Sequence, residues 1–206
     1  MAGELLADAI EASVARSGRC RLGLAGGSSA GPVLSVLIRR RPADDREVRV
    51  TWIDERHPEA SNESAARAVW RAWRPEVLSV VGGGTLDEDA VAFEQAFARR
   101  FGGLDVLLLG CGPDGHVASL FPDHPSMSRG GTCFAVTDSP KPPPTRITLS
   151  LEVLAGARHT IFVAKGAAKA DVVARARAGD RTLPLGILAD NPGHWVLDPE
   201  AAGALP

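Results

Sequence analysis

Apolar and polar positions follow two different periods along the chain. Near the N-terminus the apolar residues Leu5, Ile10 and Val14 recur at helical spacing, which predicts an amphipathic helix. Elsewhere short continuous apolar runs occur, which are typical of strands buried on both faces. The clearest of these runs is residues 105–109, and a glycine ends it. We therefore expect buried strands connected by amphipathic helices.

The same two patterns continue to the C-terminus. The other predicted strands are residues 21–25, 48–53, 132–136, 159–164 and 195–197. The other predicted helices are residues 33–40, Ser61 or Asn62 to Trp73, Asp87 or Asp89 to Phe101, 151–155 and 167–178. Strands that alternate with helices favour a mostly parallel sheet. With no repeat and no long linker, we expect one α/β domain over residues 1–206, an open, mostly parallel sheet with helices on both faces.

Composition excludes several classes of partner. The 206 residues carry a formal net charge of −2, which gives no basic footprint for nucleic acid or an anionic membrane. No apolar run reaches the length of a membrane span, and the acidic N-terminus does not look like a signal peptide. Cys20, Cys111 and Cys133 form neither a CxxC motif nor a zinc pattern. We expect a cytoplasmic monomer or weak homo-oligomer with reduced thiols, no metal and no cofactor.

In a parallel sheet, ligands bind beyond the carboxyl ends of the strands, so the segments that follow the predicted strands are the candidates. The first is Gly26-Gly27-Ser28-Ser29. Two glycines let the backbone approach an anion, and the next helix offers free N–H groups at its positive end. The segment suits a phosphate, although it is neither a Walker loop nor a GxGxxG motif. Taken alone, it is also ordinary turn and capping chemistry.

The second segment is Asp54-Glu55-Arg56-His57, after the strand 48–53. Arg56 can hold a carboxylate or phosphate through two parallel hydrogen bonds. Asp54 can accept hydrogen bonds from sugar hydroxyls or orient Arg56. An isolated charged run of this kind is more often a solvated loop.

The third segment, residues 110–122, is the most informative. Three glycines, Gly112 among them, and a proline within six positions fix an irregular turn. Asp114 and His116 flank Gly115, close enough for the carboxylate to set the tautomer and the pKa of the imidazole. A histidine so placed can act as a general base near neutral pH. The alternative is a histidine bonded only to its own turn, but a loop beyond a central strand favours function.

Further positive charge follows in the C-terminal third. The proline-rich stretch 140–144 precedes Arg146 and includes Lys141. Lys165 and Lys169 follow the strand 159–164 and open a helix. Lysine in the first turn opposes the helix dipole, and a bound phosphate would compensate for this. For Lys165 we expect simple solvation.

Together these segments resemble the 6-phosphogluconolactonase family. The resemblance spans most of the chain and rests on Gly26–Ala30, Ile53–Arg56, Ser61-Asn62, Gly110–Pro122, Pro140–Leu149 and Gly166–Ala170. Its most specific element is Asp-Gly-His-x-Ala-Ser-Leu-Phe-Pro. Two departures are Ser29-Ala30, where the family has Thr-Pro, and Ile53, where it has glycine. The resemblance implies the open α/β sheet that this family shares with glucosamine-6-phosphate deaminases.

The resemblance also implies an activity, the metal-independent hydrolysis of 6-phosphoglucono-1,5-lactone to 6-phosphogluconate. His116 would be the base that activates water, with Asp114 and Arg56 as its catalytic partners. The substrate-binding residues it implies are Gly26, Gly27, Ser28, Asp54, Asn62, Gly112, Arg146 and Lys169.

Two alternatives stay open. An amino-sugar-phosphate isomerase or deaminase also carries Asp-Gly-His, but has an acidic residue a few positions later. Here that stretch is Ser119-Leu120-Phe121-Pro122, without a carboxylate. A non-catalytic sugar-phosphate-binding protein would keep the pocket, but retention of both Asp114 and His116 argues against it. No GxSxG motif indicates a nucleophilic serine.

Overall fold

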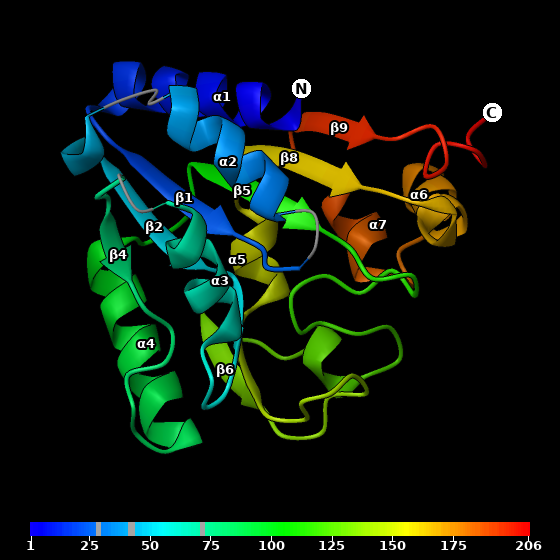
Figure 1. Cartoon of the computed structure of the whole chain (residues 1–206). Coiled ribbons are helices and arrows are strands. Elements are labelled where there is room, and N and C mark those ends of the chain that lie inside the picture. Colours follow the sequence, from blue (N-terminus) through cyan, green and yellow to red (C-terminus); the bar gives the residue numbers. More distant parts are fainter. Residues whose placement is uncertain (28–29, 41–43, 71–72) are drawn as a thin grey trace.

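A computed structural model describes residues 1–27, 30–40, 44–70 and 73–206. A six-stranded sheet runs through its centre, and all neighbouring strands in it are parallel (Figure 1). In spatial order the strands are β4 (Glu76–Leu78), β2 (Val48–Trp52), β1 (Cys20–Leu24), β5 (Val106–Gly110), β8 (His159–Ala164) and β9 (Gly193–Leu197). The predicted α/β fold with a mostly parallel sheet is confirmed.

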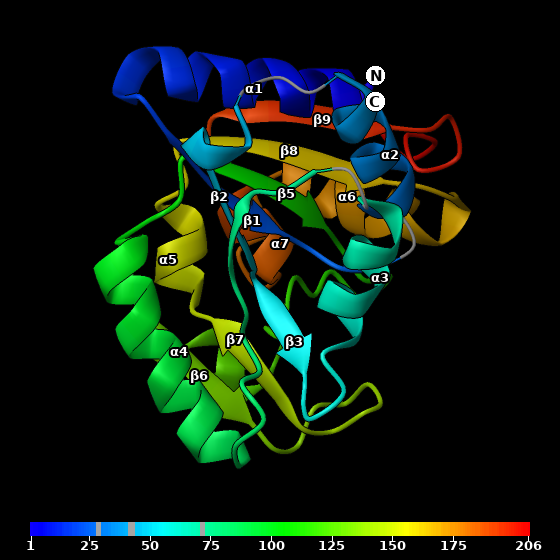
Figure 2. The same cartoon turned by 60° about the vertical axis from the view of Figure 1, so that its left-hand side comes forward.

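Helices cover both faces of this sheet, which explains the continuous apolar runs of its central strands. The first four side chains of β5 are at most 2% exposed. On one face lie α1 (Ala2–Ser17) and α2 (Ala30–Arg40), and on the other α5 (Leu151–Ala155) and α7 (Pro184–Leu188) (Figure 2). The helix α6 (Ala170–Arg177) packs against α7.

A second, smaller sheet was not predicted. It is antiparallel, with the order β3 (Asp54–Arg56), β7 (Arg146–Leu149) and β6 (Cys133–Val136), and α4 (Leu86–Arg100) packs on it. The expectation of a charged loop at residues 54–57 was therefore wrong, because three of these residues form β3. Three polar residues carry no strand pattern, and β3 is stabilised by pairing with β7, far away in the sequence.

The helix α3 (Ser61–Val69) begins differently from the prediction, which made Ser61 or Asn62 its cap. Ala60 precedes the helix with φ 47°, and its side chain cannot cap. The carboxylate of Glu55 instead accepts hydrogen bonds from the backbone N–H groups of Asn62 at 2.9 Å and Glu63 at 2.8 Å. A negative charge at this position also suits the positive end of the helix dipole.

The same helix ends four residues before Trp73, where the pattern had placed its end. Trp70 and Trp73 are both buried, with ring centroids 5.1 Å apart, and Trp70 also packs on Trp52. If the helix continued from Trp70, the side chains of Trp70 and Trp73 would lie three positions apart on one face of that helix. The helix instead ends at Val69, and the edge strand β4 begins at Glu76.

The order of strands creates a crevice between β1 and β5. From β1 the chain passes to β2 and β4 on one side, and then crosses back to β5 on the other side. The segments that leave β1 and β5 therefore diverge at their carboxyl ends. Ligands of open α/β sheets bind at such a switch point.

Candidate active site

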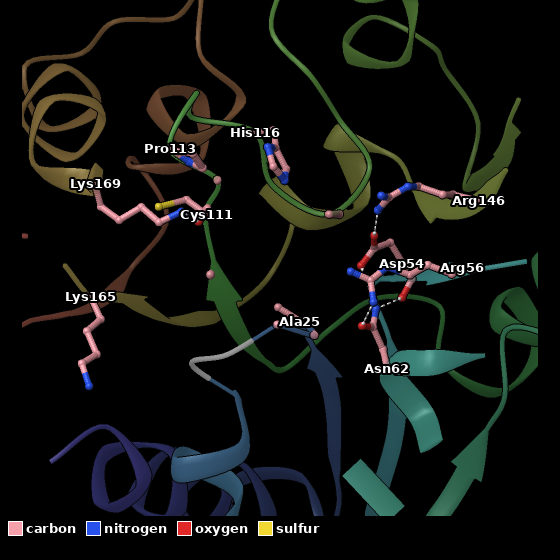
Figure 3. Close-up of a pocket in the computed structure, with 15 residues that line it drawn as sticks. Ala25, Asp54, Arg56, Asn62, Cys111, Pro113, His116, Arg146, Lys165 and Lys169 are labelled. Carbon is pink, nitrogen blue, oxygen red and sulfur yellow. Dashed lines mark hydrogen bonds and ion pairs between the residues drawn. The ribbon is translucent and has the colours of Figure 1, made fainter. Parts of the chain in front are cut away.

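A pocket of about 280 Å³ opens at this switch point (Figure 3). Nine of the eleven predicted site residues line it, namely Gly26, Gly27, Asp54, Arg56, Asn62, Gly112, His116, Arg146 and Lys169. Asp114 does not line it but contacts His116. Ser28 lies outside the described residues. The structure therefore brings together segments that are far apart in the sequence.

His116 is held by the carboxylate of Asp114, whose Oδ1 lies 2.5 Å from its Nδ1. Partial burial raises the pKa of Asp114, but hydrogen bonds from His116 and Lys141, and the charge of His116 when its ring is protonated, outweigh this and bring the pKa to about 2. Lys141 Nζ lies 3.1 Å from the other oxygen, Oδ2. An ionised Asp114 accepts the Nδ1 proton of the neutral ring, which makes Nε2 the basic atom.

The environment of His116 keeps its ring neutral. Burial lowers the pKa of His116 below its usual 6.5, and this outweighs the opposing effect of Asp114. The ring packs on Phe121, with centroids 4.9 Å apart. On its other side is Gly112, where a Cβ would lie 2.1 Å from Nδ1 and Cε1 of the imidazole. Only glycine leaves room for the ring in this position.

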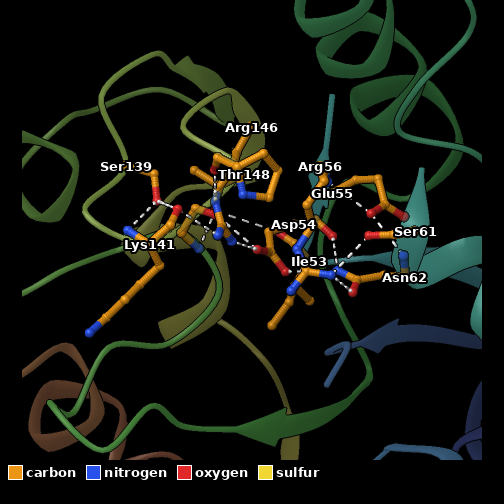
Figure 4. A network of polar contacts seen from close by, with 12 residues as sticks. Ile53, Asp54, Glu55, Arg56, Ser61, Asn62, Ser139, Lys141, Arg146 and Thr148 are labelled. Atoms are coloured by element: carbon orange, nitrogen blue, oxygen red, sulfur yellow. Dashed lines mark hydrogen bonds and ion pairs between the residues drawn. The ribbon is translucent and has the colours of Figure 1, made fainter. Parts of the chain in front are cut away.

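Asp54 is the centre of a polar network in the opposite wall (Figure 4). Its Oδ2 accepts a hydrogen bond from Ser119 Oγ at 2.8 Å and lies 3.7 Å from Arg146 Nη1. Asn62 Nδ2 donates to the backbone oxygen of Asp54 at 3.0 Å. Ser119 and Arg146 hold the carboxylate and Asn62 holds the backbone, so the orientation of Asp54 in the pocket wall is fixed.

Arg56 contributes a donor that has no partner among the described residues. Its Nη1 donates to Ser61 Oγ at 2.9 Å and to Asn62 Oδ1 at 2.8 Å, while its buried Nε makes no hydrogen bond. A buried donor without a partner is rare in folded proteins, and here it belongs to a side chain that also lines the pocket. Gly26 permits this arrangement, since a Cβ there would lie 1.9 Å from Asn62 Oδ1.

Arg146 lines the pocket but also has a structural task. It is 4% exposed, and its Nε and Nη2 donate to the backbone oxygens of Lys141, Pro142 and Pro143 at 3.0–3.1 Å. The guanidinium therefore holds the proline-rich loop that carries Lys141 to Asp114. Only Nη1, near Asp54, faces no loop carbonyl, so a direct contact of Arg146 with an anion stays a prediction.

The two lysines after β8 lie on the other side of the pocket from Arg56, with His116 between (Figure 3). Lys169 Nζ donates to the backbone oxygen of Cys111 at 2.7 Å, which fixes its end beside the loop after β5. Lys165 is exposed, as expected, but it also lines the pocket. Solvation alone was therefore too narrow a prediction for Lys165.

Sequence analysis gave no role to Ser119, although it is fully buried and bonded to Asp54. The only signal was its place in the motif after His116. Within the described ranges, no group of three His, Cys, Asp or Glu side chains is arranged to hold a metal ion, and no helix is long and apolar enough to cross a membrane.

A family described as glucosamine-6-phosphate isomerases/6-phosphogluconolactonase matches residues 1–197. The chain belongs to this family. Among its members, the 6-phosphogluconolactonase of Mycobacterium tuberculosis is 35% identical over 100% of this chain and 93% of that protein. The human 6-phosphogluconolactonase is 33% identical over 91% of this chain and 81% of that protein. The resemblance found in the sequence is confirmed.

Solved structures of the family agree with the fold. The 6-phosphogluconolactonase of Trypanosoma brucei superposes with a TM-score of 0.79 at 26% identity, covering 100% of this chain and 96% of that one. A monomeric glucosamine-6-phosphate deaminase gives the same TM-score at 19% identity, which shows the shared fold alone.

Proposed function

We propose that residues 1–206 form one catalytic domain that hydrolyses 6-phosphoglucono-1,5-lactone to 6-phosphogluconate. The observation that carries this proposal is the placement of His116. Its ring is neutral, oriented by Asp114, and directed into a pocket with cationic side chains on both sides. The names of the relatives at 33–35% identity support the same substrate.

In the proposed reaction, His116 Nε2 takes a proton from water as the oxygen attacks the lactone carbonyl. Asp114 stabilises the imidazolium that forms. When the tetrahedral intermediate collapses, the ring C–O bond breaks and the imidazolium returns the proton to the leaving oxygen. The lactone is an activated ester, so no covalent intermediate with the chain is required.

Arg56 is the proposed donor to the oxygen on which charge develops. Its side chain lines the pocket, and its Nη1 is fixed by two hydrogen bonds. A donor held in advance stabilises an oxyanion without reorganisation, and removal of one such donor typically costs about 10²–10³ in kcat. Asp54, in the same wall, is placed to accept hydrogen bonds from sugar hydroxyls.

The phosphate is proposed to bind across the pocket, at the glycines after β1 and beside Lys169. Gly27 has φ 87°, a conformation that glycine adopts without strain, and the helix α2 starts three residues later. Lys165 adds a second charge on this side. The described residues of one chain supply all of these groups, and we propose a monomer or weak homo-oligomer, located in the cytoplasm, as the working form.

The decisive experiment is a direct assay of the purified chain with freshly generated 6-phosphoglucono-1,5-lactone, corrected for spontaneous hydrolysis. We expect release of 6-phosphogluconate, and no ammonia from glucosamine 6-phosphate. Ammonia release would instead identify a deaminase. Binding of 6-phosphogluconate without turnover of the lactone would identify a non-catalytic binding protein.

A further inference from the structure

A second concavity, of about 490 Å³, lies at the opposite end of the central sheet, where the parallel strands begin. Among the residues that line it are seven arginines, called here the arginine concavity: Arg16, Arg19, Arg21, Arg49, Arg99, Arg100 and Arg158. Asp105 is the one carboxylate in its described lining. The whole chain has a net charge of −2, so composition alone does not produce this excess.

Part of the positive charge is balanced within the protein. Asp105 is 3% exposed and accepts hydrogen bonds from Arg21 Nε and Nη2 at 2.8 and 2.9 Å. Arg158 Nε lies 3.4 Å from the same carboxylate. These two guanidinium groups share one negative charge, just before the first residue of β5.

A second carboxylate, Glu76 at the start of β4, also serves two arginines. It accepts from Arg49 Nε at 2.7 Å and from Arg100 Nη2 at 2.7 Å. Arg49 also donates to the backbone oxygen of Arg100 at the end of α4. Four arginines therefore share two carboxylates.

The other three arginines have no such partner. Arg16, Arg19 and Arg99 are exposed and take part in no ion pair of residues 1–27, 30–40, 44–70 and 73–206. The remaining positions of the chain contain no aspartate or glutamate that could supply one. Their charges converge on the concavity without compensation.

The negative ends of helix dipoles balance only part of this positive charge. The helices α1 and α4 both end at this side of the sheet (Figure 1), with Arg16, Arg99 and Arg100 in their last turns. Each helix C-terminus carries roughly half a negative charge. Together with Asp105 and Glu76, this makes about three negative charges against seven guanidinium groups. An excess of about four positive charges is left.

We propose that the arginine concavity binds a compact anion with several phosphoryl groups, at a site separate from the catalytic pocket. Guanidinium groups bind phosphate oxygens through paired hydrogen bonds, and several of them converge here on one hollow. Its volume lies in the range of small-molecule sites. A compact ligand is favoured over nucleic acid because Glu4, Asp8 and Glu11 on α1 share Arg40, and the excess of negative charge there would repel an extended phosphate backbone.

The test uses the full chain and inorganic tripolyphosphate, titrated by calorimetry at low ionic strength without magnesium. The variant R16Q/R19Q/R99Q removes the three unpaired charges and no described ion pair. Each removed contact to a charged phosphate contributes about tenfold or more to affinity, so the triple variant should bind at least about tenfold more weakly. Its lactonase activity should equal that of the wild type, since none of the three residues lies in the catalytic pocket.

The control, R129Q/R177Q/R181Q, removes three exposed arginines outside the concavity, of which Arg181 takes part in a described ion pair, with the exposed Asp190. It should bind tripolyphosphate within about twofold of the wild type, because screened charges at a distance contribute little. The variant K169A distinguishes this site from the proposed phosphate contact in the catalytic pocket, and it should keep the binding that R16Q/R19Q/R99Q loses.

Equal affinity of wild type and R16Q/R19Q/R99Q would overturn the proposal, and so would the absence of binding to the wild type at low ionic strength. Loss of binding in K169A would assign the anion to the catalytic pocket. Tighter binding of a short DNA duplex than of tripolyphosphate would show that the concavity is a nucleic-acid surface instead. None of these results depends on the identity of the substrate that the catalytic pocket turns over.

Discussion

The two ends of the central sheet use positive charge in different ways. At the carboxyl end, three of the four cationic side chains in the described pocket lining, all but the exposed Lys165, are fixed by hydrogen bonds to oxygen atoms of the protein. Lys169 is held by a backbone oxygen, Arg146 by three, and Arg56 by Ser61 and Asn62. At the amino end, seven arginines converge with two carboxylates between them.

The two ends therefore suit different tasks: the carboxyl end orients a few charged groups, whereas the amino end attracts anions. A reaction requires atoms at defined positions, and at the carboxyl end of the sheet hydrogen bonds hold a few charged groups in place. A surface that gathers anions requires mainly a strong field, which many loosely held guanidinium groups provide. Changes at the first end should therefore alter turnover, and changes at the second should alter anion binding or stability.

The largest effect is expected at His116. Replacement by asparagine keeps a hydrogen-bonding side chain but removes the proposed base, and should lower kcat by about 10²–10⁴. In the wild type, only the neutral ring accepts a proton, so activity should rise with pH. Because burial lowers the pKa of His116, the midpoint of the rise in kcat/KM should lie below pH 6.5. Near wild-type turnover by H116N would show that another group is the base.

A smaller effect is expected at Gly112, which touches the imidazole without taking part in the chemistry. Gly112→Ala would place a methyl group 2.1 Å from the ring, and the ring must move. A displaced base should lower kcat by about 10-fold to 100-fold with little change in KM. The control is Gly130→Ala, outside the pocket lining, where a Cβ would meet no atom within 4 Å and activity should persist. Similar losses in both variants would mean that the contact with the imidazole is not the cause.

At the amino end, Asp105→Asn should change stability but not turnover. The carboxylate is almost fully buried against Arg21, and its loss should reduce the free energy of unfolding by about 1–3 kcal/mol at pH 7. Chemical denaturation measures this loss, and kcat should stay unchanged. The control Asp190→Asn breaks only an exposed pair with Arg181 and should have little effect.

The pH dependence of this loss follows from the pKa of Asp105. Although burial raises it, the hydrogen bonds from Arg21 prevail and the folded-state pKa lies below the ordinary 3.8. The stabilisation is then fully present above pH 3.8 and disappears as the pH falls through the folded-state pKa. The difference between wild type and D105N should shrink in acid. A constant difference would mean that the carboxylate charge is not its source.

The sequence predicted the parallel sheet and most of the pocket because both depend on local patterns. Glycine-rich turns and charged residues directly after apolar runs mark the carboxyl ends of strands, and Gly26, Arg56 and His116, selected in this way, line one pocket. Local sequence patterns could not predict the small sheet, because β3 exists only through its pairing with β7 some ninety positions later. For the same reason the bond from Ser119 to Asp54 has no local signal.

The short strand β3 has a consequence for how the pocket could change during evolution or design. Side chains alternate along a strand, so Asp54 and Arg56 line the pocket while Glu55, between them, caps α3. These three adjacent polar residues are therefore under two independent constraints: two of them serve the pocket, and the third stabilises the start of α3. Positions 54 and 56 can be altered in a library to seek new substrates, whereas position 55 should tolerate almost no variation even in variants that have abandoned the original chemistry.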